Sequence, residues 1–285
     1  MSESTDVADF GSNRFVRALL SASTYLLGFI FFFPVLWMVL NGFKTEDQAN
    51  GTPVFFFQPT LDQFRLVTES IPGRSSFGEV IINSFVIVLV STMIAMILAV
   101  PAAFALSIRP VTKWRDVLFF FISTKFLPVV AGILPVYIIA REFELLNTRW
   151  SLIIMYTALN LPLAVWMLRS FFQEVPSELI EAARIDGASL RSQLTSIVLP
   201  IVAPGLAATG LLCFIFAWNE FFLSLQLNTS DAQTASVWVT GFESQREDFI
   251  AKLSAASTLV VLPVVVAGWV AQKRMIRGLA MGAIK

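Results

Sequence analysis

The sequence contains no histidine and a single cysteine, Cys213, among its 285 residues. Without imidazole, the metal sites and acid–base reactions that depend on histidine are excluded. One cysteine cannot form an intramolecular disulfide or supply the ligands of a thiolate zinc cluster. Charge is also scarce: 14% of the residues are charged, and 20 Lys and Arg balance 20 Asp and Glu. No basic excess is therefore present to bind a nucleic-acid backbone.

Hydrophobic residues are correspondingly abundant. They make up 56% of the chain, against roughly 45–50% in soluble domains, which argues against a soluble enzyme. Segment 18–40 carries no charge over 23 residues, and no small-residue cleavage site follows it, so it is predicted to be a retained helix rather than a signal peptide. Such runs are also too long and too uniformly apolar for the strands of a membrane barrel. Six apolar runs predict an all-α membrane protein with six transmembrane helices, at 18–40, 80–108, 117–140, 150–168, 197–227 and 254–271.

Six spans place both termini on one side of the membrane. The two tails and the loops on their side hold twelve Lys and Arg, whereas the opposite loops hold seven, with eleven acidic residues. The excess of basic residues marks the cytoplasmic side. The expected organisation is a cytoplasmic tail 1–17, a permease domain 18–271 and a cytoplasmic tail 272–285.

Two loops carry signals of their own. The outer loop contains the aromatic stretch Val54-Phe55-Phe56-Phe57, which is predicted either to contact a partner at the outer lip or to pack on its own helix ends. The inner loop, 169–196, is long enough for a helix that starts near Pro176 and ends near Gly187, a residue able to adopt the left-handed conformation of a helix end. From spacing alone, this helix either docks another protein or lies on the membrane surface.

Residues 181–200 carry a motif. Glu181-Ala182-Ala183 is followed after three residues by Gly187, and after nine more by an Ile-x-Leu-Pro group that ends at Pro200. This spacing resembles the EAA signature of ABC importer permeases, and every fixed position is matched. The resemblance implies a type I ABC importer permease fold, in which this loop forms a coupling helix that docks into a separate ATPase subunit. Its expected coupling residues are Glu181, Ala182, Ala183, Asp186 and Gly187.

The resemblance covers nearly the whole chain. Trp218-Asn219-Glu220-Phe221 and the tail from Arg277 to Lys285 look like the maltose-type carbohydrate-uptake branch. Ser123-Thr124-Lys125 before Pro128, and segment 251–258, are similar to sorbitol and mannitol permeases. The resemblance therefore implies import of a carbohydrate, with a polyol or monosaccharide expected.

Polar groups inside apolar spans are candidates for a substrate pathway, because a charge in hydrocarbon costs at least about 2.5 kcal/mol. Lys125 and Glu220 are the charges within the predicted spans, and they are expected at different depths without a direct pair. Glu220, Asn219 and Trp218 are predicted either to line an outer opening, with a stacking face for a sugar, or to anchor the span at the interface. Asn160 is a further pathway candidate, although it and Asn83 are also expected to join helices by hydrogen bonds.

These features imply partners rather than cofactors. No Gly-Lys pair occurs, so a P-loop is absent, and ATP is expected to bind a partner ATPase dimer. A second permease subunit and a periplasmic or lipid-anchored solute-binding protein complete the expected complex, in a bacterial inner membrane. No catalytic residue, metal or nucleic acid is predicted. A secondary transporter is the alternative, but neither repeats nor paired intramembrane charges support it, and an intramembrane enzyme lacks suitable residues.

Overall fold

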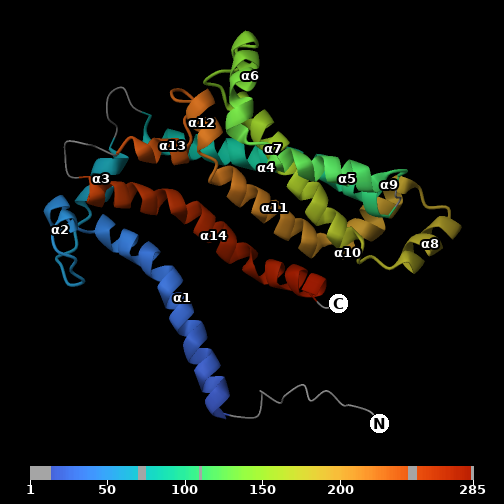
Figure 1. Cartoon of the computed structure of the whole chain (residues 1–285), viewed down its shortest axis with the longest axis horizontal. Coiled ribbons are helices and arrows are strands. Elements are labelled where there is room, and N and C mark those ends of the chain that lie inside the picture. The colour runs from blue at the N-terminus through green and yellow to red at the C-terminus, as the bar shows by residue number, and fades with distance from the viewer. Residues whose placement is uncertain (1–13, 70–74, 109–110, 243–248, 284–285) are drawn as a thin grey trace. The chain divides into compact units, whose positions relative to one another are not determined.

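The computed structural model describes residues 14–69, 75–108, 111–242 and 249–283, and every regular element in these ranges is a helix (Figure 1). In chain order they are α1 (Arg14–Gly42), α2 (Glu46–Asn50), α3 (Asp62–Thr68), α4 (Phe77–Ser107), α5 (Trp114–Ser123), η1 (Thr124–Phe126), α6 (Val129–Glu142), α7 (Arg149–Phe172), α8 (Ser177–Ile185), α9 (Leu190–Ser192), η2 (Gln193–Val198), α10 (Leu199–Ile201), α11 (Ala203–Trp218), α12 (Phe222–Leu227), α13 (Ala235–Thr240) and α14 (Ile250–Ala283).

The apolar runs of the sequence form the membrane-spanning helices. Four helices in the described part of the chain are long and apolar enough to cross a bilayer, within α1, α4, α7 and α14. Two bent helix pairs pass the same test, and counting each pair as one span gives the six that the sequence predicts. The protein is therefore an all-helical membrane protein with four to six candidate spans.

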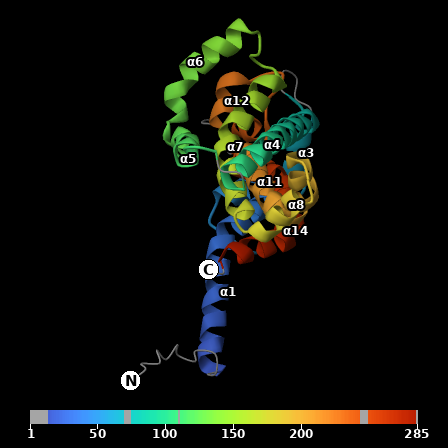
Figure 2. The ribbon, with the colours of Figure 1, turned by 90° about the vertical axis from the view of Figure 1, so that its right-hand side faces the viewer.

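The helices expected as the third and fifth spans are each bent sharply at a break, which the apolar runs of the sequence did not predict. The 114–126 and 129–142 segments meet at 90°, so α6 turns away from α5 (Figures 1 and 2). Proline explains this break, because Pro128 excludes the helical conformation at the residue before it, and Leu127 is extended with ψ 122°. In the fifth span, 190–201 and 203–218 meet at 80°, on either side of Val202 with ψ 8°.

The chain divides into two compact units, Met1–Val67 with Ser244–Thr258 and Thr68–Glu243 with Leu259–Lys285. In the second unit α4, α7 and α11 pack against one another. Ala95, Ala99 and Ala103 repeat every four residues on α4 and are fully buried. Small side chains on one face let helix backbones approach closely, which supports a tight core.

The approach of α11 to α7 requires a glycine. A Cβ placed on Gly205 would come within 2.6 Å of Cδ2 of Phe171. We expect Gly205→Ala to lower the free energy of unfolding by roughly 1–3 kcal/mol, as other overpacking substitutions do. Gly210→Ala on the same helix is the matched control, because its Cβ would meet only Met96, at 4.0 Å. Thermal unfolding of the detergent-solubilised protein measures both variants, and equal melting temperatures would contradict the prediction.

In the first unit a carboxylate caps a helix. Glu46 accepts hydrogen bonds from the backbone N–H groups of Ala251 and Lys252, each at 2.9 Å. These groups lie in the first turn of α14, whose N–H groups have no partner within the helix. Acceptance by an ionised side chain also suits the positive end of the helix dipole. Short helix α2 therefore fixes the beginning of the last span.

The aromatic stretch 54–57 lies beside a buried lysine of the same unit, Lys44, whose ammonium is 5.2 Å from the centre of the Phe57 ring. Lys44 is 1% exposed, and its ammonium donates to Oδ1 of Asn41 at 2.9 Å and lies 4.1 Å from the centre of the Trp37 ring. Burial lowers the pKa of Lys44, and the hydrogen bond and ring contacts stabilise its charged form. Phe55 packs edge-on against Trp37 at 5.2 Å, whereas Phe56 is 99% exposed. The stretch thus packs on its own helix end and leaves one ring free.

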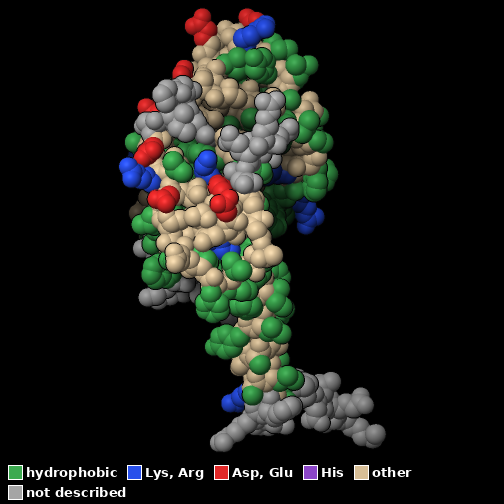
Figure 3. Space-filling view, turned by 90° about the vertical axis from the view of Figure 1, so that its left-hand side faces the viewer, with side chains coloured by type: hydrophobic (Ala, Val, Ile, Leu, Met, Phe, Trp, Pro, Cys, Tyr) green, Lys and Arg blue, Asp and Glu red, His purple; other side chains and the backbone are tan. Residues whose placement is uncertain are grey.

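Helix α1 leaves its apolar side chains uncovered. Tyr25 and Phe31 are about four-fifths exposed, and hydrophobic side chains cover the helix in the space-filling view (Figure 3). Its charged residues, Arg14 and Arg17, lie in its first turn. Such a surface suits contact with lipid or with another membrane helix.

Candidate functional site: a pocket at a helix break and a helix on the 169–196 loop

The break in the third span opens a pocket of about 350 Å³ in the second unit. Thr124 and Lys125 of η1 line one side, and α7 and the end of α11 line the others. Three of the five predicted pathway residues, Lys125, Asn160 and Glu220, lie around this one pocket. Its apolar walls come from Leu127, Val129, Leu159, Leu163, Phe216 and Ala217. The pocket therefore combines a few polar groups with an apolar lining, as small-molecule sites do.

Lys125 and Glu220 line the same pocket, although the sequence placed them at different depths. The break explains the difference, because a depth counted along a straight helix does not apply once the helix stops at Phe126. No ion pair joins the two side chains in the described structure. Both groups can therefore face a solute rather than each other.

Glu220 also organises the chain after α11. Its carboxylate accepts hydrogen bonds from the backbone N–H of Leu223, at 3.1 Å, and of Ser224, at 3.3 Å. These N–H groups belong to the first turn of α12, so Glu220 caps that helix in the way an N-terminal acceptor does. The hydroxyl of Tyr156 donates to the Glu220 backbone carbonyl at 3.2 Å, and this joins the backbone at Glu220 to α7.

Asn160 joins two helices at the base of the pocket. Its side chain is 3% exposed, and Nδ2 donates to the Cys213 carbonyl at 3.2 Å. The helix-joining role predicted for Asn160 is present, alongside its place in the pocket wall. Asn83 likewise joins elements, through bonds to Arg149 and to the Asp231 carbonyl.

Trp218 and Asn219 are not part of the pocket lining. Trp218 is 5% exposed, its indole N–H donates to the Val260 carbonyl at 3.2 Å, and its ring stacks on Phe214. A ring covered in this way has no free face for a sugar. Asn219 is exposed and donates to the Ile215 carbonyl of its own helix.

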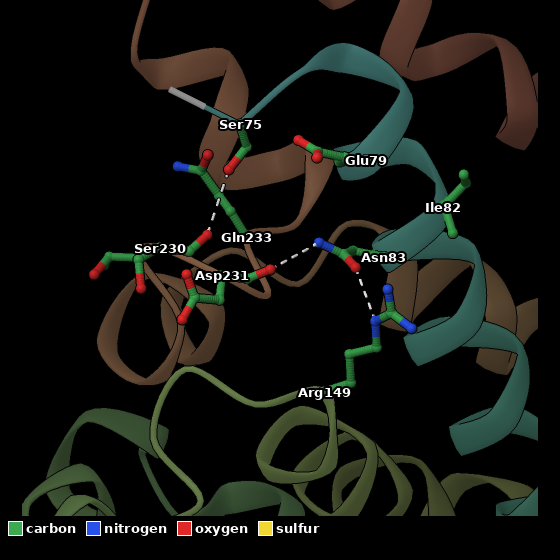
Figure 4. Close-up of a pocket in the computed structure, with 9 residues that line it drawn as sticks. Ser75, Glu79, Ile82, Asn83, Arg149, Ser230, Asp231 and Gln233 are labelled. Carbon is green, nitrogen blue, oxygen red and sulfur yellow. Dashed lines mark hydrogen bonds between the residues drawn. The ribbon is translucent and has the colours of Figure 1, made fainter. Parts of the chain in front are cut away.

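A second hollow, of about 750 Å³, lies where α4, α7 and the loop after α12 meet (Figure 4). The Nε group of Arg149 donates to Oδ1 of Asn83 at 2.8 Å, and Nδ2 of Asn83 donates to the Asp231 carbonyl at 3.3 Å. Asn83 is 3% exposed, so a buried amide fixes the arginine. The two terminal nitrogens of Arg149 stay open to the hollow, and a guanidinium edge of this kind suits a carboxylate.

The predicted helix of the inner loop is α8, and it ends as expected. Gly187 has φ +75°, the left-handed region that other residues enter at a cost. The backbone N–H of Ala188 donates to the Ala183 carbonyl at 2.9 Å, and that of Gly187 donates to the Arg184 carbonyl at 3.1 Å. This pair of bonds is a Schellman motif, which satisfies the last carbonyls of a helix.

One residue of α8, Ala183, does not lie on the docking face predicted for it. Ala183 is 7% exposed and lies on the inner face with Ile180, so it seats the helix instead of forming a docking surface. The outer face contains Glu181, Ala182 and Asp186, together with Ile185, which is 86% exposed. An uncovered isoleucine on a short loop helix favours a protein partner.

Sequence reasoning missed several residues of these sites. Tyr156 lies one helical turn before Asn160, and that spacing places both on one face of α7. Arg149 and Asp231 lie in loops or at a helix start, where sequence alone does not show which segments meet. Ile185 follows the motif directly, and its exposure depends on the way α8 rotates onto the core.

Broken spans, a mainly apolar pocket with a few polar groups at one break, and an exposed helix on the loop between spans fit a transport permease. A family model described as "Binding-protein-dependent transport system inner membrane component" matches residues 95–280. The chain belongs to this family, and it is a multi-pass protein of the inner membrane.

Several permease proteins are similar to this chain along almost its full length. The chain is 38% identical over 261 residues to a probable ABC transporter permease protein, y4oR, of Sinorhizobium fredii, covering 91% of this chain and 92% of that protein. It is 32% identical to the sulfoquinovosyl glycerol transport system permease SmoH of Agrobacterium fabrum, covering 99% and 98%. It is also 32% identical to the trehalose transport system permease SugB of Mycobacterium tuberculosis, covering 88% and 92%.

A solved structure shares the fold. A bacterial ABC transporter involved in import of the acidic polysaccharide alginate contains a chain that matches with a TM-score of 0.72 and 22% identity, covering 92% of this chain and 98% of that one. The likeness supports an ABC importer permease fold.

Proposed function

We propose that this protein forms half of the translocation pathway of an ATP-driven importer, and that the pocket around Lys125, Asn160 and Glu220 contacts a small carbohydrate during passage. The meeting of these three side chains at a helix break is the observation that carries the proposal. The lysine donates hydrogen bonds and the carboxylate accepts them, so together they suit hydroxyl groups, which do both. The apolar walls limit the number of polar contacts, and binding weak enough for release is what a pathway requires.

The proposed substrate class rests on sequence resemblance. Ser123-Thr124-Lys125, which line or adjoin the pocket, and segment 251–258 are similar to sorbitol and mannitol permeases. A sugar alcohol or monosaccharide therefore remains our prediction for the substrate. The relatives SmoH and SugB are named for sulfoquinovosyl glycerol and trehalose, so glycosides are the alternatives to test.

Uptake by cells that express the complete importer decides between these solutes. We expect radiolabelled sorbitol or mannitol to accumulate faster than maltose or trehalose, because the segments around Lys125 and at 251–258 are similar to polyol permeases. Cells without the permease provide the background for each solute. Uptake of maltose with neither polyol accepted would contradict the prediction.

The coupling role of α8 belongs to the same proposal. The outer face of α8 would dock into a cleft of an ATPase subunit, with Ile185 as its apolar contact and Glu181 as its charge. The ATPase dimer, a second permease subunit and a solute-binding protein would complete the complex, and the hollow beside Arg149 would receive an acidic side chain of the binding protein. Dependence of uptake on a co-expressed ATPase separates this function from that of a secondary transporter.

We further propose that both termini are cytoplasmic, because basic residues are in excess in the tails and in the loops on their side of the membrane. Tags placed before residue 1 and after residue 285 should both resist protease added outside spheroplasts, and both should be cut after lysis. A tag in the outer loop at Gly51 is the control that should be cut in intact spheroplasts. Opposite accessibility of the two terminal tags would overturn the topology.

A further inference from the structure

A π-helical turn lies between the coupling helix and the pocket. Segment η2 contains residues Gln193–Val198, between α9 and α10. The backbone N–H of Leu199 donates to the Leu194 carbonyl, five residues earlier, where an α-helix would make the bond to the fourth. Turns of this kind are rare and are concentrated at functional sites. The chain that leads from the end of α8 to Glu220 passes through this turn.

Gln193 ties the turn to the end of α8. Its side chain is 2% exposed, and Nε2 donates to the Ala188 carbonyl at 2.8 Å. Ala188 also donates its backbone N–H to the Ala183 carbonyl at 2.9 Å in the Schellman motif. The other side-chain atom, Oε1, is buried without a hydrogen-bond partner in the described part of the chain. Buried acceptors are nearly always paired, so this turn is held in an arrangement that leaves one polar group unsatisfied.

The sequence beyond the turn permits more than one register. Val198 and Val202 are the buried residues of this segment, at 0% and 4% exposure, and they are four residues apart. The pair one residue earlier is Ile197 and Ile201, and the pair one residue later is Leu199 and Ala203. Each alternative pair is also apolar and has the same spacing. A register change of one residue would therefore bury a comparable apolar pair.

We propose that η2 changes register when α8 is displaced, and that Gln193 is the positioning residue that holds the resting register. At 3.6 residues per turn, a shift of one residue rotates the helix beyond the turn by about 100°. The rotated segment runs from Leu199 through the bend at Val202 to the first residue of α11, ahead of Gly205. Movement of the coupling helix would thus reach the beginning of α11 as a rotation, and α11 ends at the pocket beside Glu220. The inference rests on the proposed coupling function of α8.

Cysteine labelling tests the rotation directly in the complete transporter. Cys213→Ala removes the native thiol, and Val202→Cys, Ile201→Cys and Ala203→Cys are then compared one at a time with a small membrane-permeant maleimide. In the nucleotide-free complex, position 202 should react at least tenfold more slowly than the exposed positions 201 and 203. In the complex trapped with ATP and vanadate, position 202 should gain reactivity, and one of its two neighbours should lose it. Changes of the same sign at all three positions, or no change, would overturn the proposal.

A second measurement separates this inference from the proposed function. Gln193→Leu removes the bond to Ala188 and introduces an apolar side chain of similar size, and Ser196→Ala in the same turn is the control at an exposed position. We expect Gln193→Leu to keep ATPase association and basal ATP hydrolysis while uptake falls at least tenfold. Wild-type uptake by Gln193→Leu would overturn the role of Gln193, even where α8 variants lose the ATPase. Retention of the ATPase by α8 variants would instead overturn the coupling function itself.

Discussion

Replacing Gly187 with valine should abolish uptake while leaving the protein in the membrane at normal abundance. Gly187 has φ +75°, and a residue with a Cβ pays roughly 1–2 kcal/mol to enter that region. Space is not the obstacle, because a Cβ at Gly187 would meet nothing within 4 Å. The cost therefore acts on the backbone, through the Schellman bonds that orient α8. Membrane insertion should be unaffected, because Gly187 lies outside the candidate spans.

Two further variants separate backbone from surface effects. Gly187→Asn should retain most uptake, because asparagine enters the left-handed region more readily than other residues with a side chain. Ile185→Asp should release the ATPase without a change in the backbone, since Ile185 is 86% exposed and a carboxylate would be desolvated in an apolar cleft. Copurification of the ATPase with the tagged permease measures association, and solute uptake measures function. Wild-type association and uptake by both Gly187→Val and Ile185→Asp would disprove the coupling assignment.

Substitutions at Ala182 and Ala183 are expected to have different effects, because only Ala182 lies on the exposed face of α8. Because Ala183 is 7% exposed on the inner face, a tryptophan there would push α8 off its seat rather than block a docking surface. Ala182→Trp is the direct surface variant, since Ala182 is exposed. We expect Ala182→Trp to leave thermal stability unchanged and to lose the ATPase, whereas Ala183→Trp should lower stability as well.

The membrane fold could be predicted because composition alone sets it. A run such as 18–40, without a charge over 23 residues, has few structures available other than a spanning helix. The breaks could not be predicted in the same way. Pro34, Pro101, Pro135, Pro162 and Pro263 lie inside intact helices, whereas Pro128 lies at a break. Proline is tolerated where neighbouring helices satisfy the freed carbonyls, and sequence does not show those neighbours.

The coupling motif could be predicted from spacing, but its rotation could not. Spacing places Leu179, Ala182 and Ala183 on one side of a helix, but it does not show which of them contacts the core. Contact of Ile180 with the core decides that Ala183 faces inward. Trp218 shows the same limit at the pocket, because its neighbours Phe85 and Phe214 cover its ring. Both positions depend on contacts between segments far apart in the chain.

Replacing Lys125 with methionine should lower the maximal rate of uptake by about ten- to a hundredfold. The side chain lines the pocket and is exposed, so its removal should leave the fold intact. Loss of a hydrogen bond from a charged donor costs about 1.5–3 kcal/mol, and each 1.36 kcal/mol is a factor of ten in rate. Lys125→Arg keeps the charge and should retain a larger share of the rate.

The apparent KM separates a pathway role from a binding role. If a solute-binding protein captures the solute, that protein sets the apparent KM, so Lys125→Met should change the maximal rate with little change in KM. Arg141→Met is the matched control, because it removes a largely exposed cation from α6, beyond the same helix break and outside the pocket lining. Initial uptake rates over a range of solute concentrations measure both parameters. A wild-type maximal rate for Lys125→Met, or an equal loss for Arg141→Met, would show that the pocket at the helix break is not on the translocation pathway.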